Sequence, residues 1–360
     1  MPDATKTSPH LIFLFSSSRE KMLSEVREGK GTDTALRGMN HIPGAEYLTI
    51  GECRHAAFCS WLLARLPRFI QVMMLVPRLL RYDFVVAQDE LFLGYAVSVC
   101  ARLFLLKTRW VYITMTSSTL LRRHAAHPLR RFLLKKFWAS YARIICLSSE
   151  QREDLIRFGI AHERLTLIPF GVDADFFRPS DVSREEKLIV SVGRDPGRDY
   201  ETLFKAVERV AHACIVVTGR RNVPRDMPVP ANVSVLYDRN YTEIRDLYAR
   251  ARLMVIASKS TDMPDGSDCS GQTVIMDALA AGKAVIATER PWIDEYFIPG
   301  QDLIVVPPSD PEALARAIDS LWHDAGKRKH LAVSGREKVV AHYTTKAFAT
   351  ALRNGMNSIL

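Results

Sequence analysis

The segment from Asp268 to Gly282 has the residue types and spacing of a binding site for a phosphorylated ligand. It reads as a small-residue loop and then a helix, with Ser270 as the predicted N-cap and Gly282 as the stop. Such a helix start presents unpaired N–H groups and a positive dipole end to an anion. Asp277, just over one turn further on, can accept hydrogen bonds from ribose hydroxyls. These features predict a nucleotide-sugar site, although a capped, buried helix without a ligand explains the segment alone equally well.

A second candidate loop follows the predicted strand Leu188–Val192. Gly193 permits a tight turn, and Arg194 and Arg198 can fork onto a diphosphate. Two loop arginines by themselves are more often solvated surface charges. The loop therefore supports a binding site only when it is considered together with the segment that begins at Asp268.

The chain has 360 residues, which favours two domains, and its 48% hydrophobic and 25% charged residues are ordinary for a globular protein. Its six cysteines show neither zinc-ligand nor CxxC spacing, which suggests reduced thiols in the cytoplasm. The first ten residues lack the layout of a signal peptide. The longest apolar run, Leu91–Leu106, contains Arg102 and is too short to span a bilayer.

Strands and helices are predicted to alternate along both halves, which favours parallel sheets covered on both faces. A Pro/Gly break within Leu167–Asp173 marks the expected boundary between the halves. The expected strands of the first half are 11–15, 82–87, 109–114, 144–147 and one from 165, and those of the second are 188–192, 214–218, 233–237, 253–257, 284–288 and 303–306. The expected helices are 60–81, 91–106, 129–143, one ending at 159, 200–212, 241–251, one from 270, 312–325, 328–341 and 345–360.

The chain resembles the retaining nucleotide-sugar glycosyltransferases of glycosyltransferase family 4. The resemblance extends from about residue 144 to 318 and is vague in the first 110 residues. It rests on four motifs in the family's order: Ser148-Ser-Glu150, Leu167-Ile-Pro-Phe-Gly-Val-Asp173, Val192-Gly-Arg194 with Arg198-Asp-Tyr200, and Gly271–Gly282.

The resemblance implies an α/β protein of the GT-B fold, in which two Rossmann-like domains face a central cleft. The expected domains are an acceptor-binding domain at 1–169 and a nucleotide-sugar-binding domain at 170–344. The last helix, about 345–360, is expected to pack back on the first domain.

Site residues carry over by position from the family's motifs. Arg194 and Arg198 match the Arg and Lys that hold the donor diphosphate and act in catalysis, and each alanine variant is expected to lose orders of magnitude in turnover. The other expected donor-binding residues are Gly193, Ser270, Gly271, Gln272, Thr273 and, on the ribose, Asp277. No metal or other cofactor is expected, because no cluster of metal-ligand residues is evident in the sequence.

Two departures from the family pattern stand out. The first Glu of the family's Glu-x7-Glu motif falls on Cys269, so Cys269 and the adjacent Asp268 are only candidate sugar contacts. The family's His after the strand at 111–115 is missing. His124 and His127 follow a few residues later as candidates on the acceptor side, and a basic surface loop is the alternative explanation for them.

The charge of the chain is uneven. The formal net charge is +9, and residues 54–143 hold 15 basic but only three acidic residues. Basic helices with interspersed aromatics, such as the one near Arg130, suit an anionic membrane surface. Solvated faces of ordinary core helices explain the same pattern, and nucleic acid is disfavoured because no recognition motif accompanies the charge.

The sequence therefore predicts a metal-independent, retaining hexosyltransferase with a nucleotide-diphosphate-sugar donor and a hydroxyl acceptor. A lipid-linked or cell-envelope glycan acceptor is a further expectation, with the enzyme in the cytoplasm and at times peripheral on the inner face of the membrane. Two alternatives stay open. One is a nucleotide-sugar epimerase of the same fold, and the other is an inactive GT-B module that serves as a partner protein.

Overall fold

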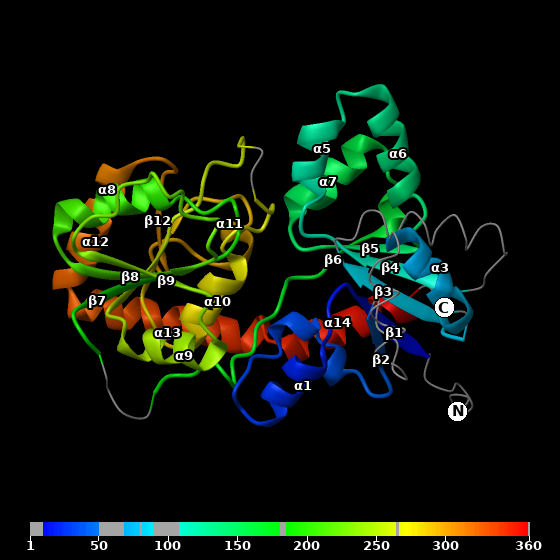
Figure 1. The fold of residues 1–360 in the computed structure, drawn as a ribbon, viewed down its shortest axis with the longest axis horizontal. Helices are drawn as coiled ribbons and strands as arrows, with labels where there is room; N and C mark the ends of the chain where they lie inside the picture. Colours follow the sequence, from blue (N-terminus) through cyan, green and yellow to red (C-terminus); the bar gives the residue numbers. More distant parts are fainter. Residues whose placement is uncertain are drawn as a thin grey trace.

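The computed structural model describes residues 10–49, 68–79, 81–88, 108–180, 185–263 and 266–358. Two lobes lie side by side, each built on a twisted sheet with helices on both faces (Figure 1). No helix in these ranges is long and apolar enough to cross a membrane.

The sheet of the first lobe has six parallel strands in the order β2-β1-β3-β4-β5-β6. Its central strands are apolar and almost completely buried, as expected for a parallel sheet covered on both faces. The strands are β1 Leu11–Phe15, β2 Glu46–Thr49, β3 Phe84–Gln88, β4 Arg109–Ile113, β5 Arg143–Cys146 and β6 Leu165–Leu167.

The sheet of the second lobe also has six parallel strands, in the order β12-β11-β10-β7-β8-β9. This is the strand order of a dinucleotide-binding Rossmann domain, with the order reversing between β7 and β10. The strands are β7 Leu188–Val192, β8 Ala213–Thr218, β9 Val233–Tyr237, β10 Leu253–Ile256, β11 Val285–Thr288 and β12 Ile304–Val306.

Helices connect the strands and cover the sheets (Figure 1). In the first lobe they are α1 Glu20–Arg27, α3 Arg68–Leu79, α5 Ser117–His124, α6 Pro128–Trp138 and α7 Ser149–Phe158, with short 3₁₀ turns η1 Thr34–Leu36, η2 Met39–His41 and η3 His162–Arg164. The rest are α8 Tyr200–Val210, α9 Tyr241–Arg250, α10 Gln272–Ala280, α11 Ile293–Tyr296, α12 Pro311–His323, α13 Ala325–His342 and α14 Thr345–Asn357.

The expected α/β fold with two Rossmann-like sheets is confirmed, and the strands agree with the sequence to within two residues. β2, α1, α5 and α11 have no counterpart among the expected elements. The predicted helix at 91–106 lies outside the described residues, as do 54–67 of the basic stretch. The helix predicted over 129–143 ends at Trp138, because a turn and then β5 take up the remaining residues.

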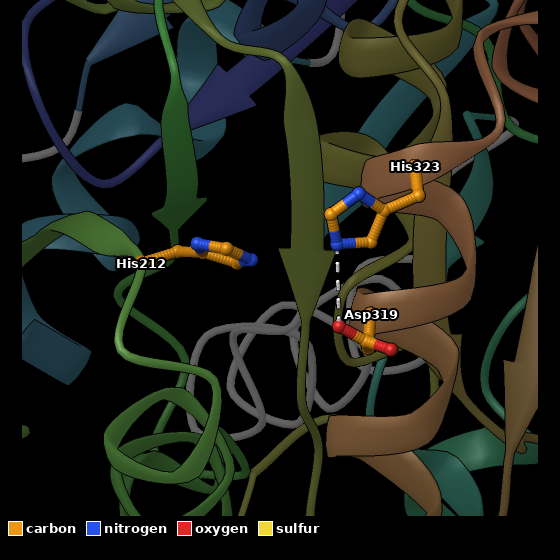
Figure 2. Close-up of side chains that lie close together, drawn as sticks. All are labelled: His212, Asp319 and His323. Atoms are coloured by element: carbon orange, nitrogen blue, oxygen red, sulfur yellow. Dashed lines mark ion pairs between the residues drawn. The ribbon is translucent and has the colours of Figure 1, made fainter.

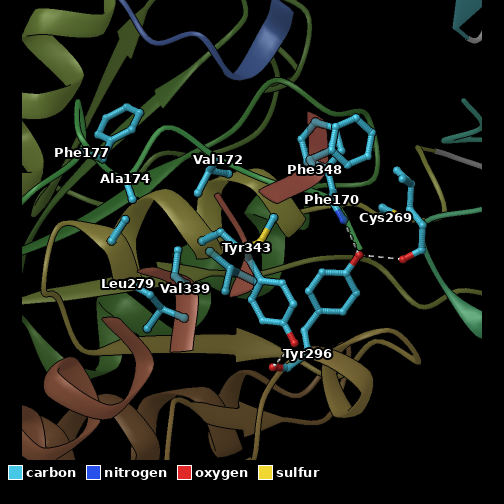
Figure 3. Packing of buried hydrophobic residues seen from close by; sticks show 14 of the residues in the cluster. Phe170, Val172, Ala174, Phe177, Cys269, Leu279, Tyr296, Val339, Tyr343 and Phe348 are labelled. Carbon is cyan, nitrogen blue, oxygen red and sulfur yellow. Dashed lines mark hydrogen bonds between the residues drawn. The ribbon is translucent and has the colours of Figure 1, made fainter. Parts of the chain in front are cut away.

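A single apolar core runs from one lobe into the other. Figure 3 shows its centre, where aromatic rings from α11, the interlobe segment and the C-terminal helices meet. The Tyr296 hydroxyl accepts a hydrogen bond from the Phe170 N–H at 2.8 Å and donates one to the Leu147 carbonyl at 2.7 Å. Leu147 belongs to the first lobe and Tyr296 to the second, so this buried hydroxyl joins the lobes.

The last helix, α14, lies against the first lobe although it follows the second in the chain (Figure 1). Phe348 packs on Phe170 at 5.3 Å between ring centroids. The crossing is tight, because a Cβ on Gly171 would lie 2.2 Å from the Thr344 carbonyl oxygen. The domain limits at 169 and 344 stay predictions.

Candidate functional site

The site begins where both sheets reverse strand order. Ligands of open α/β sheets bind beyond the carboxyl ends of strands at this switch point. In the second lobe the switch lies between β7 and β10, and in the first between β1 and β3. The loops after β1 and β7 line one cleft of about 770 Å³, which also receives residues from η1, α9 and α10.

The cleft carries an excess of positive charge. Its lining includes five basic side chains, Lys21, Lys30, Arg37, Arg194 and Arg239, against three acidic ones, Glu25, Asp238 and Asp277. Such a concave, cationic wall concentrates anionic ligands. The cleft therefore suits a ligand that carries phosphate.

The start of α10 forms one wall of the cleft. The N-cap of α10 is Gly271, with φ of 83°, so the prediction of Ser270 as N-cap is wrong. The physical reason is a turn in which the Gln272 N–H reaches the Cys269 carbonyl at 3.0 Å, which delays the helix. A glycine N-cap has no side-chain acceptor for the first N–H groups of the helix. Those groups belong to Thr273 and Val274, and both residues line the cleft.

The end of α10 agrees with the sequence prediction. Gly282 has φ of 70° and lies one residue beyond the C-cap. Its N–H reaches the Leu279 carbonyl at 2.9 Å, and the Lys283 N–H reaches the Ala278 carbonyl at 3.1 Å. These two bonds form a Schellman motif, which holds α10 at a fixed length between the cleft and β11.

Arg198 lies buried beneath the loop after β7, with 3% of its surface exposed. A Cβ on Gly193 would come within 2.6 Å of its Nε, so only glycine fits above the guanidinium. Nη2 donates to the Ser191 hydroxyl at 3.3 Å, while Nε and Nη1 have no hydrogen-bond partner within the described part of the chain. A Cβ on Gly271 would lie 3.4 Å from Nη1, so the guanidinium sits beside the N-cap of α10. The Arg198 guanidinium and the positive end of the α10 dipole are thus buried side by side, and two nitrogens of the guanidinium donate no hydrogen bond.

Arg194 lies at the surface of the same loop and lines the cleft. Its guanidinium contacts the Arg239 carbonyl at 3.3 Å and lies 4.0 Å from the Asp238 carboxylate. The structure therefore separates the two predicted arginines, with Arg194 at the cleft wall and Arg198 below it. The C-terminal end of the loop between the two arginines is fixed, because the Asp199 carboxylate caps α8 by accepting a hydrogen bond from the Thr202 N–H at 3.0 Å.

Asp277 faces the cleft from α10 and is nearly buried. Its Oδ1 is buried and has no hydrogen-bond partner among the residues described by the structure. Burial, reinforced by the nearby carboxylate of Asp173, raises the pKa of Asp277 well above its ordinary value. Asp277 therefore places a carboxyl group with unused hydrogen-bonding capacity at the wall of the cleft.

Replacing Asp277 with Asn is expected to stabilise the protein in a pH-dependent way. A carboxyl group with a raised pKa binds its proton more tightly in the folded state. Its contribution to the free energy of unfolding therefore falls as pH rises from the unfolded pKa to the folded one, and then stays constant. Asn does not titrate, so the melting temperature of the variant relative to wild type should rise across that window. Thermal unfolding at a series of pH values measures this, with Asp226→Asn at an exposed site as control. A melting-temperature difference between variant and wild type that does not change with pH would contradict the prediction.

Asp268 lies beside the cleft but faces the other lobe. Its carboxylate accepts hydrogen bonds from the N–H groups of Ser118 and Thr119 at 2.9 and 2.7 Å. It also accepts from the Thr119 hydroxyl at 2.7 Å and the Gln151 amide at 3.0 Å. α5 has no side-chain cap of its own, so Asp268 caps it from the second lobe. This gives Asp268 a lobe-joining contact, and it does not line the cleft.

The remaining predicted residues do not line the cleft either. Cys269 is buried in the core that joins the lobes, near Tyr296 in Figure 3. His124 lies on α5, with Nδ1 3.3 Å from an Arg130 nitrogen, and exposed His127 precedes α6. Of the predicted site residues, four line the cleft: Gly193, Arg194, Thr273 and Asp277. Four others are buried behind the cleft wall: Arg198, Ser270, Gly271 and Gln272. The remaining four, Asp268, Cys269, His124 and His127, lie elsewhere.

Several cleft residues had no signal in the sequence. Arg37 comes from the turn after η1, and Tyr241 opens α9. Tyr241 is half-buried, and its pKa is raised by burial and then by the charge of Asp277. Only the Asn240 and Glu243 capping box, which fixes the start of α9, could have been read from the sequence.

Two family models match this chain, one on each lobe. Residues 39–176 match the model described as Glycosyltransferase Family 4, and residues 186–324 match the one described as Glycosyl transferases group 1. Alpha-maltose-1-phosphate synthase from Mycolicibacterium smegmatis is 22% identical over an alignment of 275 positions that covers 62% of this chain and 68% of that protein.

Solved structures show the same fold. HepE from Anabaena, in complex with UDP and glucose, superposes with a TM-score of 0.72 at 16% identity, over 97% of this chain and all of that one. Sucrose-phosphate synthase from Thermosynechococcus elongatus superposes with a TM-score of 0.70 at 19% identity, over 97% and 99%. The fold and the two family matches together support a glycosyltransferase of the GT-B type.

Proposed function

We propose that this chain is a retaining glycosyltransferase of the family 4 type that transfers a hexose from a nucleotide-diphosphate sugar to a hydroxyl acceptor. One observation carries the proposal. The buried guanidinium of Arg198 lies beside the N-cap of α10, and two of its nitrogens have no hydrogen-bond partner among the described residues. Such an arrangement is costly unless an anion binds there. A donor diphosphate supplies that charge.

The proposed chemistry is electrostatic. As the bond between the anomeric carbon and the phosphate oxygen breaks, negative charge develops on the diphosphate. Arg198, Arg194 and the N–H groups of Thr273 and Val274 stabilise that charge from fixed positions. The acceptor oxygen bonds to the anomeric carbon on the same face, and its proton passes to the released diphosphate. The products are the glycoside and a nucleoside diphosphate, with no metal required in this scheme.

The other roles follow from position. Asp277 accepts the ribose hydroxyls, and the first lobe, residues 1–169, presents the acceptor to the donor lobe, residues 170–344. Because Anabaena HepE was solved with UDP-glucose, UDP-glucose is the first donor to test. The base, the sugar and the acceptor are open to experiment.

The donor is identified by thermal unfolding with UDP-, GDP-, ADP- and TDP-linked sugars. The true donor should raise the melting temperature, because at one hundred times its Kd it adds about 2.7 kcal/mol to the free energy of unfolding. Release of nucleotide is then measured with and without candidate acceptors, and NMR of the glycoside reports the anomeric configuration. No donor that stabilises the protein, or a product with inverted configuration, would overturn the proposal.

The same assay separates the two alternatives. An epimerase would release nucleotide without an acceptor and return a sugar of changed configuration. An inactive module would bind a donor, or nothing, and release no nucleotide. Acceptor-dependent release is expected only of the transferase.

We further propose that the first lobe contacts an anionic membrane through α6, which suits a lipid-linked acceptor. One face of α6 packs inward with Leu134, Phe137 and Trp138. The opposite face exposes Leu129, Phe132 and Leu133 by 61%, 56% and 42%. Four exposed basic residues surround them: Arg130, Arg131, Lys135 and Lys136. An exposed apolar strip with basic flanks is typical of a helix that lies in the plane of a membrane surface.

Replacing Leu129 and Phe132 together with Ser is expected to weaken binding to anionic vesicles about 30-fold. This corresponds to about 2 kcal/mol of lost apolar insertion. Vesicle flotation with phosphatidylcholine, alone and mixed with phosphatidylglycerol, measures the partition. The matched control is Val333→Ser with Val340→Ser, two exposed apolar residues on α13. Equal binding to both lipids, or equal loss in the control, would remove the membrane proposal.

A further inference from the structure

Three potential metal ligands converge at the edge of the second lobe. His212 lies in the turn between α8 and β8, while Asp319 and His323 lie on α12. One ligand atom from each residue lies within 4.8 Å of the other two. Figure 2 shows an edge of the His212 ring directed toward the Asp319 and His323 pair.

The His212 ring is held in place by packing. It stacks on the Trp322 indole with ring centroids 3.7 Å apart and planes 12° from parallel. Its Nε2 is buried and has no hydrogen-bond partner in the residue ranges that the structure describes. A buried, oriented nitrogen without a partner points to a missing ligand.

Asp319 and His323 are four residues apart, so both project from one face of α12. Their Oδ1 and Nε2 atoms are 3.6 Å apart, and their side chains are 65% and 73% exposed. Ligand atoms around a tetrahedral zinc ion are about 3.4 Å apart, which follows from bond lengths near 2.1 Å. Small rotamer changes of the two exposed side chains can close the remaining gap to His212.

We propose that His212, Asp319 and His323 bind a divalent transition-metal ion, of which Zn²⁺ is the best match, with solvent as the fourth ligand. Two imidazoles and one carboxylate form a borderline-soft set that suits zinc. Arg252, whose guanidinium lies 4.9 Å from the Trp322 ring centroid, is the nearby cation, and it is paired with Glu185 at 3.0 Å. Its charge is therefore largely compensated.

The position of this site makes its role structural. His212 precedes β8, and the cleft lies beyond the other end of the same six-residue strand. That strand is about 20 Å long. The ion would tie the turn before β8 to α12 without touching the donor. Zinc should therefore raise the melting temperature and leave turnover unchanged.

The test is a titration of the tag-free full-length protein with Zn²⁺ by calorimetry, together with thermal unfolding. Wild type should take up one ion saturably. His323→Ala and His212→Ala should each weaken binding at least about 100-fold, since even outer-shell changes cost 10- to 100-fold. His330→Ala, on exposed α13, should bind like wild type. His323 is exposed on α12, so its variant folds even if the His212 variant does not. Wild type that binds no zinc, or a His323 variant that binds it normally, would overturn the proposal.

Discussion

Replacing Arg198 with Met should lower turnover by about 10²- to 10³-fold while the protein stays folded. The loss follows from removing buried, preorganised donors beside the start of α10, where the leaving diphosphate gains charge. Stability should hold or increase, because Nε and Nη1 have no protein partner and the charge lies near a helix N-terminus. Met approximates the length of the Arg side chain, so it limits any cavity under Gly193. Steady-state kinetics with the identified donor, beside thermal unfolding, measures both effects.

Two further variants control the Arg198 experiment. Arg198→Lys keeps the charge but loses the planar fork, so it should recover part of the activity. Arg194→Ala should also reduce turnover, but less, because that guanidinium is largely exposed and screened. Wild-type turnover in a folded Arg198→Met protein would show that the buried guanidinium has no role in transfer. If Arg198→Met loses both its activity and its fold, the activity of Arg198→Lys decides whether the buried charge takes part in transfer.

The regular elements could be predicted because their signals are local. Leu11–Phe15 is apolar from end to end, and Leu188–Val192 is apolar except for Ser191, as fully buried parallel strands are. β2 lacks this signal, because Glu46 is exposed and only Thr49 is buried. α5 was missed for a different reason. Its polar start has no local cap, and the cap comes from Asp268, 150 residues later.

The residue types of the candidate site could be predicted from the sequence, but the burial of its side chains could not. The loop glycines and arginines after β7 could be read from the chain, as could Asp277. That Arg198 lies under Gly193 depends on how two loops pack, which no spacing encodes. Ser270 shows the opposite case, in which a residue of the right type is displaced from the cap by a turn. Arg37 reaches the cleft only because two lobes meet there.

Replacing Asp268 with Ala should destabilise the contact between the lobes by about 3–5 kcal/mol, the usual result of removing one partner of a buried charged network. The carboxylate is fully buried and accepts four hydrogen bonds, and Arg122 adds an ion pair at 3.7 Å. Its removal leaves the N–H groups of Ser118 and Thr119 without acceptors inside the protein. Urea unfolding measures the loss, and hydrogen exchange over 115–124 should show faster exchange at the start of α5.

Asp310→Ala is the matched control, because Asp310 caps α12 from within its own lobe through the Ala313 N–H at 2.8 Å. Loss of a local cap costs about 1 kcal/mol and should leave exchange in α5 unchanged. Equal destabilisation by the two variants, with α5 protected in both, would contradict a lobe-joining role for Asp268. Because Asp268 lies three residues before the N-cap of α10, the loop that caps α5 also leads into the proposed diphosphate site. Asp268→Ala should therefore also weaken donor binding, whereas Asp310→Ala should not. The donor Kd thus distinguishes a cap that joins the lobes from a cap that only stabilises a helix.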